Sequence, residues 1–203
     1  MNQVVAILLA AGRSRRMGAF KPLLPFGHQT VVEACIENLL AAGVKEVVVV
    51  VGHRAEEMKA RLARLPVSFA VNDEATSEMS VSIARGVERV RAEAGALLIA
   101  LCDQPAIPPL VIRRVIEAWE QAGAVLVVPE FEGRGGHPVL IDARFRRELL
   151  ALDADRGLRA LFDAHREAVR RLPVASPFVA RDMDTWEDYA RLYMEIVGTP
   201  PPG

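Results

Sequence analysis

Cysteine is scarce in this sequence. The two cysteines, Cys35 and Cys102, lie far apart in apolar segments of a 203-residue chain. Two thiols placed in this way supply neither a disulfide framework nor the closely spaced ligands of a zinc site. We therefore expect a protein of a reducing compartment, the cytoplasm.

The sequence also lacks an excess of one charge and a long apolar run. It holds 25 Lys and Arg against 26 Asp and Glu, so its net charge of -1 gives no reason to expect nucleic acid or a membrane surface as a partner. No uncharged run approaches the roughly 18 residues that cross a bilayer. The apolar residues 4–11 are followed, not preceded, by basic residues, which is the reverse of a signal peptide. An anion site must therefore be local.

Short apolar runs alternate with helical patterns along the chain. Residues 4–10, 47–51, 96–101 and 124–128 are typical of strands that are buried on both faces. Thr30 and Glu33 have the spacing of a capping box that begins a helix running to Gly43. Residues 109–121, stopped by Gly123, and 186–197, stopped by Gly198, have helical patterns.

This alternation predicts a single α/β domain with three layers, in which helices cover both faces of a mainly parallel sheet. We assign residues 1–198 to the domain and expect residues 199–203 to be a disordered tail. Residues 130–141 depart from the alternation, because three glycines form a flexible turn before a short apolar stretch. That segment predicts a hairpin-like insertion with an antiparallel edge strand.

The loop after the first strand is rich in glycine and cations. Gly12 and Gly18 frame it, and its cations are Arg13, Arg15, Arg16 and Lys21, whereas the first acidic residue of the chain is Glu33. Ligands of open α/β sheets bind beyond the carboxyl ends of strands, so the loop favours polyphosphate binding over a solvated basic turn. It lacks the Lys-Ser/Thr ending of a P-loop, and the chain has no Gly-x-Gly-x-x-Gly fingerprint.

Two carboxylates are candidates for a metal site. Asp103 ends the apolar run 96–102, and Asp184, which we favour over Asp182, precedes the last helix. Mg²⁺ needs only one or two carboxylates together with substrate phosphates. The alternatives are a turn-initiating residue for Asp103 and a helix N-cap for Asp184.

The residues Leu9, Ala10, Gly12, Arg16, Met17, Gly18 and Lys21 match the signature Leu-Ala-x-Gly-x-x-x-Arg-Met-Gly-x-x-Lys. Here the chain resembles the molybdenum-cofactor nucleotidyltransferases, which have a Rossmann-like GT-A-like fold. The resemblance implies that residues 9–12, with Arg13, surround the base and ribose. It also implies that Arg16 and Lys21 hold the triphosphate, and that Asp103 and Asp184 bind Mg²⁺, with Arg16, Lys21 and Asp103 as the catalytic set.

Other segments extend this resemblance. Asn72, Ser80 and Ser82 match residues that contact the nucleotide, although Glu78 stands where the family commonly has Gly, and the two serines equally suit a helix start. Gly136, His137 and Pro138 match a Gly-His-Pro found near the acceptor in the cytidylyl-transferring branch; a structural role for the histidine is as well supported.

The function implied is transfer of CMP from CTP to the terminal phosphate of molybdenum cofactor, with a molybdenum hydroxylase as the recipient of the product. Ala11 favours this branch, because the guanylyl branch usually has Gly there. Three alternatives stay open: a guanylyltransferase using GTP, a nucleotidyltransferase for a sugar or alcohol phosphate, and a non-catalytic protein that binds nucleotide or delivers cofactor.

Overall fold

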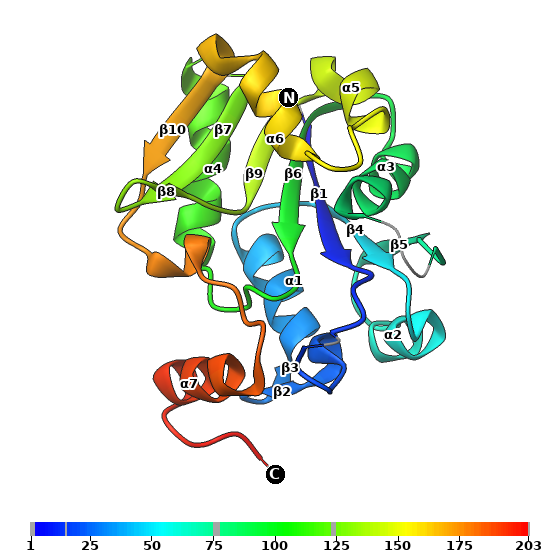
Figure 1. The fold of residues 1–203 in the computed structure, drawn as a ribbon, viewed down its shortest axis with the longest axis vertical. Helices are drawn as coiled ribbons and strands as arrows, with labels where there is room; N and C mark the ends of the chain where they lie inside the picture. The colour runs from blue at the N-terminus through cyan, green and yellow to red at the C-terminus, as the bar shows by residue number, and fades with distance from the viewer. Residues whose placement is uncertain (1–2, 15, 75–77, 123–124, 203) are drawn as a thin grey trace.

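A computed structural model describes residues 3–14, 16–74, 78–122 and 125–202 of the chain. The described residues form an eight-stranded sheet with the order β10-β7-β9-β6-β1-β4-β5, and β8 is attached to β7 (Figure 1). The strands are β1 (Gln3–Ala10), β4 (Glu46–Val51), β5 (Val67–Val71), β6 (Ala94–Leu101), β7 (Leu126–Phe131), β8 (Arg134–Gly135), β9 (Val139–Asp142) and β10 (Val169–Pro173). The pairs β6–β1, β1–β4, β4–β5 and β7–β10 are parallel.

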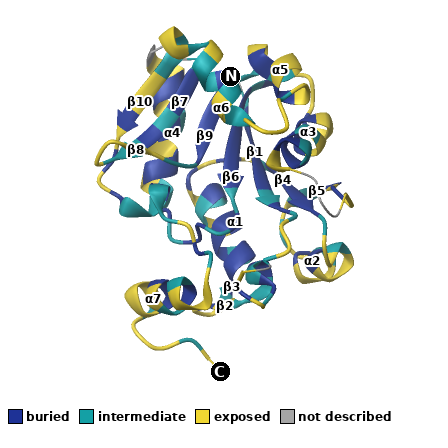
Figure 2. Cartoon of the chain, viewed as in Figure 1, coloured by how far each residue is buried: buried dark blue, intermediate teal, exposed yellow. Residues whose placement is uncertain are grey.

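Helices cover both faces of this sheet. Alternate residues of β1 belong to two separate cores, since Val4, Ala6 and Leu8 lie in one and Val5 and Ile7 in the other. Side chains from α1 (Val31–Ala41), α2 (Ala55–Arg61), α4 (Pro109–Ala122) and α7 (Trp186–Val197) complete the first core. Those from α3 (Met79–Arg89), α5 (Arg146–Leu150) and α6 (Leu158–Ala164) complete the second. The predicted three-layer α/β fold is confirmed, and Figure 2 shows the buried sheet between helices whose outer faces are exposed.

Local sequence explains where the main helices begin and end. The backbone N–H of Thr30 donates to Glu33 Oε2 at 2.7 Å, which confirms the capping box at the start of α1. A second capping box joins Thr185 to Asp188 at the start of α7. Gly198 ends α7 with a φ of 84°, a left-handed conformation that glycine adopts without strain.

The predicted strands match β1, β4, β6 and β7, although Gly123 and Ala124 lie outside the described residues. The apolar runs did not predict β5 and β10, which are the two edge strands of the sheet. Ser68 interrupts the first of these strands, and the exposed Arg170 and Arg171 interrupt the second. Because only part of an edge strand is buried, its sequence lacks the continuous apolar run of a central strand.

The predicted antiparallel strand in residues 130–141 exists, but its expected place at the edge of the sheet is wrong. β9 pairs antiparallel with both β6 and β7 and therefore lies inside the sheet. Val139, Leu140 and Ile141 are all buried. Three consecutive buried apolar residues are what a strand with neighbours on both sides requires.

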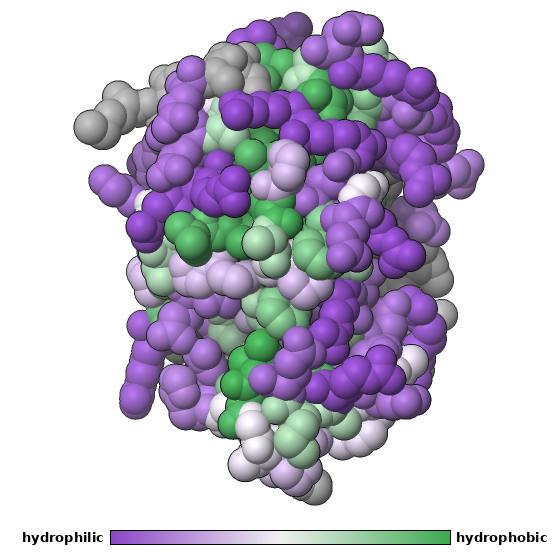
Figure 3. Space-filling model, turned by 90° about the vertical axis from the view of Figure 1, so that its left-hand side faces the viewer, coloured by the Kyte–Doolittle hydropathy of each residue, from purple (hydrophilic) through white to green (hydrophobic). Residues whose placement is uncertain are grey.

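Two further features complete the fold. β2 (Pro25–Phe26) and β3 (Gln29–Thr30) form a small antiparallel hairpin beside α7, whose Tyr189 donates a hydrogen bond to the carbonyl oxygen of Pro25 at 2.8 Å. In the part of the chain that the structure describes, no helix combines the length and apolar character needed to cross a bilayer. The face shown in Figure 3 is largely hydrophilic, with smaller hydrophobic areas between the polar side chains.

Candidate nucleotide-binding site

A pocket of about 650 Å³ opens where the carboxyl ends of β6, β1, β4 and β5 meet. This volume is typical of small-molecule sites, and this edge is where open α/β sheets bind their ligands. The pocket is lined by Leu9, Ala10, Ala11, Gly12, Arg13, Ser14, Arg16, Lys21, Pro22, Gly52, His53, Asn72, Asp73, Glu74, Glu78, Met79, Ser82, Leu101, Cys102, Asp103 and Asp184. Most of the predicted site residues are therefore brought together.

The loop after β1 folds back on itself through Ser14. The Ser14 hydroxyl accepts a hydrogen bond from the backbone N–H of Lys21 at 3.1 Å, and its carbonyl accepts one from Met17 at 3.1 Å. Phe20 is buried beside His53, at 5.8 Å between ring centroids, and beneath the Arg54 guanidinium, at 5.0 Å. These contacts fix the backbone from which Lys21 reaches into the pocket. Arg15 lies outside the described residues.

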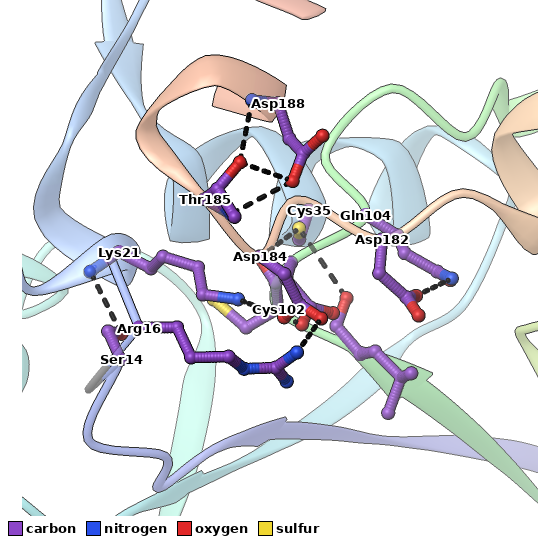
Figure 4. A network of polar contacts seen from close by, with 12 residues as sticks. Ser14, Arg16, Lys21, Cys35, Cys102, Gln104, Asp182, Asp184, Thr185 and Asp188 are labelled. Atoms are coloured by element: carbon purple, nitrogen blue, oxygen red, sulfur yellow. Dashed lines mark hydrogen bonds and ion pairs between the residues drawn. The ribbon is translucent and has the colours of Figure 1, made fainter. Parts of the chain in front are cut away.

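Two cations from this loop meet two carboxylates from distant parts of the chain, and Figure 4 shows Lys21 and Arg16 beside one of them, Asp184. Lys21 Nζ lies 3.3 Å from Asp103 Oδ2 and 3.0 Å from Asp184 Oδ1. Arg16 Nη1 lies 2.9 Å from Asp184 Oδ2. The Lys21 side chain is only 12% exposed, whereas that of Arg16 is 75% exposed. The Lys21 ammonium therefore bridges the two carboxylates inside the pocket, while Arg16 approaches from its open side.

Asp103 is the less solvated of the two carboxylates. Burial raises its pKa; the positive charge of Lys21 opposes this effect, and Asp182 and Asp184 add to it. Its Oδ1 atom is buried and has no hydrogen-bond partner. A buried carboxylate oxygen without a donor is costly to the fold, and a bound cation would remove that cost. Among the residues that the structure describes, no group of three or more His, Cys, Asp or Glu side chains could hold a metal ion.

Asp184 and Asp182 have different roles in the structure, and only Asp184 lines the pocket. The N-cap of α7 is Thr185, so Asp184 is not occupied in capping the helix and instead faces the pocket. Asp182 accepts a hydrogen bond from Gln104 Nε2 at 2.8 Å. The same amide lies 3.4 Å from the carbonyl oxygen of Val179. The buried Gln104 thus ties the turn that carries Asp103 to the segment that carries Asp184.

The other end of the pocket lies beyond β4 and β5. Asn72 is buried, and its side-chain amide donates to Ser82 Oγ at 2.8 Å. Gly52 leaves no room for a side chain, since a Cβ there would lie 2.5 Å from the carbonyl oxygen of Asn72 and 3.0 Å from the Cβ of Ala11. The pocket wall is thus formed by backbone close to Ala11, where a flat ring can approach closely. The carboxylates of Asp73, Glu74 and Glu78 make this end acidic.

A family model for the MobA-like NTP transferase domain matches residues 6–169. The chain belongs to the MobA-like NTP transferase family. The matched range contains both the loop after β1 and Asp103, whereas Asp184 follows it in the sequence. The resemblance inferred from the loop residues is confirmed, and the chain is a nucleotidyltransferase by family.

The proteins to which this MobA-like chain is similar carry the names of different activities. The chain is 31% identical to the nicotine blue oxidoreductase of Paenarthrobacter nicotinovorans over 197 residues, which are 93% of this chain and 96% of that protein. It is 27% identical to the molybdenum cofactor cytidylyltransferase of Escherichia coli over 142 residues, covering 70% and 71% of the two chains.

Solved structures share the fold along its whole length. A nucleotidyl transferase from Methanothermobacter thermautotroptrophicus superposes with a TM-score of 0.83 at 29% identity, covering 98% of this chain and 99% of that one. The Mycobacterium tuberculosis protein Rv0371c in complex with manganese superposes with a TM-score of 0.80 at 29% identity, covering 95% and 98%.

Two segments of this MobA-like chain do not line the pocket, although the sequence associates them with substrate. Ser80 is buried in the first turn of α3. Gly136, His137 and Pro138 lie between β8 and β9, where the backbone N–H of His137 donates to the carbonyl oxygen of Val179 at 2.9 Å. The backbone hydrogen bonds of Gly136 and His137 hold this segment in the fold, and substrate binding by Ser80, Gly136, His137 and Pro138 stays a prediction.

His137 has a defined structural environment. Its Nδ1 lies 3.2 Å from the carbonyl oxygen of Ile99 in β6, and because a carbonyl can only accept, the proton is on Nδ1. Burial lowers the pKa of His137, although the bond to Ile99 and the charges of Asp182 and Asp103 oppose that shift. The imidazole is therefore neutral near pH 7 and holds the segment against β6.

Sequence reasoning did not assign a role to Ser14, Gly52, His53 or Gln104. The position of Ser14 between Gly12 and Lys21 was an available signal, because a short hydroxyl side chain often closes a turn. The sequence gives no local sign that Gln104 meets Asp182, which lies 78 residues away.

Cys102 lines the pocket but stays protonated, since its hydrogen bond with Cys35 and its burial raise the pKa of the thiol.

Proposed function

We propose that this chain is a Mg²⁺-dependent cytidylyltransferase that transfers CMP from CTP to the terminal phosphate of molybdenum cofactor and releases pyrophosphate. The observation that carries the proposal is the meeting of Arg16, Lys21, Asp103 and Asp184 in one pocket at the carboxyl end of the sheet. A protein that only binds nucleotide has no need of paired carboxylates beside the phosphate-binding cations. The identity to the E. coli cytidylyltransferase supports the choice of base and acceptor.

Asp103 and Asp184 are the residues that would hold the metal. Two carboxylates suit Mg²⁺, which keeps several water molecules and takes substrate phosphates as its other ligands. The unpartnered Asp103 Oδ1 atom supports this assignment. When bound there, Mg²⁺ would neutralise charge on the phosphate oxygens of the nucleotide.

The chain's own residues would act by position and charge. Arg16 and Lys21 bind the triphosphate, and Ser14 holds the backbone of Lys21 in place. An oxygen of the acceptor's terminal phosphate attacks the α-phosphorus, and the bond from that phosphorus to the bridging oxygen of the β-phosphate breaks. The two cations stabilise the charge that collects on the leaving pyrophosphate. The reaction needs no nucleophile from the protein, which agrees with the protonated state of Cys102.

Ala11 and Gly52 support a pyrimidine at the other end of the pocket. The methyl group of Ala11 lies close to Gly52, so it narrows the pocket at the place where the resemblance puts the base. The proposal also includes a cytoplasmic location and delivery of the product to a molybdenum hydroxylase. The absence of a disulfide framework in the sequence supports the location. The hydroxylase partner rests on the resemblance to the molybdenum-cofactor nucleotidyltransferases.

The test is release of pyrophosphate from each of the four nucleoside triphosphates, with Mg²⁺ and molybdenum cofactor. Asp103→Asn should lower kcat/KM at least about a hundredfold, because loss of even an indirect metal partner commonly has an effect of 10- to 100-fold. Asp182→Asn is the matched control, because its amide oxygen can still accept from Gln104 and it removes the same charge outside the pocket lining. Equal activity of the wild type and Asp103→Asn would refute the proposed role of Asp103.

The same assay separates the other functions. Turnover with GTP alone would identify a guanylyltransferase. Turnover with a sugar phosphate in place of the cofactor would identify a sugar-phosphate nucleotidyltransferase. An oxidoreductase is the second candidate, because the relative that matches 93% of this chain has that activity. Oxidation or reduction of nicotine blue, without pyrophosphate release, would favour it.

A further inference from the structure

Lys21 occupies the space between the two carboxylates that would bind the metal. Its Nζ atom lies within 3.3 Å of Asp103 Oδ2 and 3.0 Å of Asp184 Oδ1. The side chain is 12% exposed, so the ammonium group is held inside the pocket and not at its mouth. Arg16 contacts the second oxygen of Asp184 at 2.9 Å. Three of the four carboxylate oxygens therefore face a protein cation.

A metal ion bound by both carboxylates would need the same space. Mg²⁺ binds oxygen at about 2.0–2.1 Å and accepts little distortion of its ligand geometry. An ammonium group that bridges the two carboxylates would be in contact with such an ion, and two cations in a weakly solvated pocket repel each other strongly. Lys21 must therefore leave the carboxylates before both can bind a metal.

The bridging contact also has a purpose in the protein without metal. Asp103 and Asp184 are like charges that the fold brings near each other, and Asp182 and Asp184 raise the pKa of Asp103 further. The positive charge of Lys21 offsets this repulsion. The ammonium group thus reduces the repulsion between the two carboxylates in the free protein, as a bound divalent ion would reduce it in the complex.

A triphosphate is the ligand that can move Lys21. It carries several negative charges into the pocket that Arg13 and Arg16 also line, and it competes with the carboxylates for the ammonium group. We propose that the Lys21 ammonium group occupies the metal site of the free protein in place of a divalent cation. A bound triphosphate then makes this site available to the metal, because it draws Lys21 away from the carboxylates. The inference rests on the proposed use of a metal by Asp103 and Asp184. Because coupling between two sites is reciprocal, metal and nucleotide then strengthen each other's binding.

The first experiment measures the binding of Mn²⁺ to the full chain without nucleotide, by electron paramagnetic resonance. Lys21→Gln should bind Mn²⁺ on the order of tenfold more tightly than the wild type, which is within the usual range of coupling between sites. Arg16→Gln is the matched control, because it removes the same charge from a side chain that contacts only Asp184 and is 75% exposed. Its affinity should rise by less than threefold, as expected for a screened surface charge. Equal gains in the two variants would overturn the proposal, since general electrostatics would then explain both.

A second measurement uses the wild type and stays informative if Lys21→Gln does not fold. The side-chain ammonium resonance of Lys21 is followed by NMR in a metal-free buffer while inorganic tripolyphosphate is added. The resonance should shift as the ion pairs with Asp103 and Asp184 are replaced, and no shift at saturating tripolyphosphate would overturn the proposal. Neither measurement depends on turnover. Absence of pyrophosphate release would count against the proposed function alone, and absence of Mn²⁺ binding in every variant would count against both.

Discussion

Gly136→Ala is the substitution for which the structure makes the sharpest prediction. A Cβ at this position would lie 1.9 Å from the carbonyl oxygen of Val179 and 2.4 Å from its carbonyl carbon, whereas ordinary contacts begin at 3.4 Å. Both contacts are with backbone, so the two chain segments must separate by roughly 1.5 Å, a strain that typically costs 1–3 kcal/mol of stability. The variant should therefore fold with a lower Tm.

The displacement should also reach the carboxylates. Val179 lies in the 3-10 helix Pro177–Ala180, which leads directly to Asp182 and Asp184. A misplacement of about 1 Å in a catalytic site can lower the rate about a hundredfold. We expect kcat/KM for pyrophosphate release to fall by that order in Gly136→Ala, together with weaker binding of Mn²⁺.

Gly135→Ala is the matched control. It adds the same methyl group one residue earlier, where the nearest atoms are side-chain atoms of Val128 at 3.1 Å and Arg171 at 3.6 Å. These side chains can adjust, so this variant should keep most of its activity. If Gly136→Ala matched Gly135→Ala in both Tm and activity, the reasoning would be refuted. A rise in the KM for the acceptor alone, with unchanged Mn²⁺ affinity, would instead support the sequence prediction that Gly136 contacts the acceptor.

Two further predictions concern the links behind the site. Gln104→Leu leaves Asp182 without its hydrogen-bond donor, so we expect a loss of about 1–3 kcal/mol in the free energy of unfolding. We also expect weaker binding of Mn²⁺, because Gln104 ties the turn of Asp103 to the segment of Asp184. Unchanged values in urea denaturation and in Mn²⁺ titration would count against this link. The pKa of His137 is lowered below 6.5, so the stability that its neutral form contributes is fully present above pH 6.5 and is lost as pH falls through the lowered value. Urea denaturation between pH 7.5 and 5 should show this loss in the wild type and a flatter profile in His137→Gln; identical slopes would contradict it.

The sequence by itself determined the elements whose signals are local. A continuous apolar run is enough to predict a central strand such as β4, and the pair Thr30 and Glu33 is enough to begin α1, because each pattern involves residues that are neighbours in the chain. The segment from Leu9 to Lys21 was sufficient to identify the family, since the residues of its signature lie close together in the chain. The alternation of strands and helices fixed the fold class for the same reason.

Tertiary structure decided what depends on distant partners. Lys21 meets Asp103 across 82 residues and Asp184 across 163, and no periodicity of the sequence encodes such a meeting. The sheet also decided that β9 lies inside and that the mixed sequences of β5 and β10 form its edges, because a strand's burial depends on its neighbours in space. The position of Lys21 between the carboxylates is a consequence of that assembly, whereas the sequence analysis assigned Lys21 to triphosphate binding and to the catalytic set, without a contact to either carboxylate.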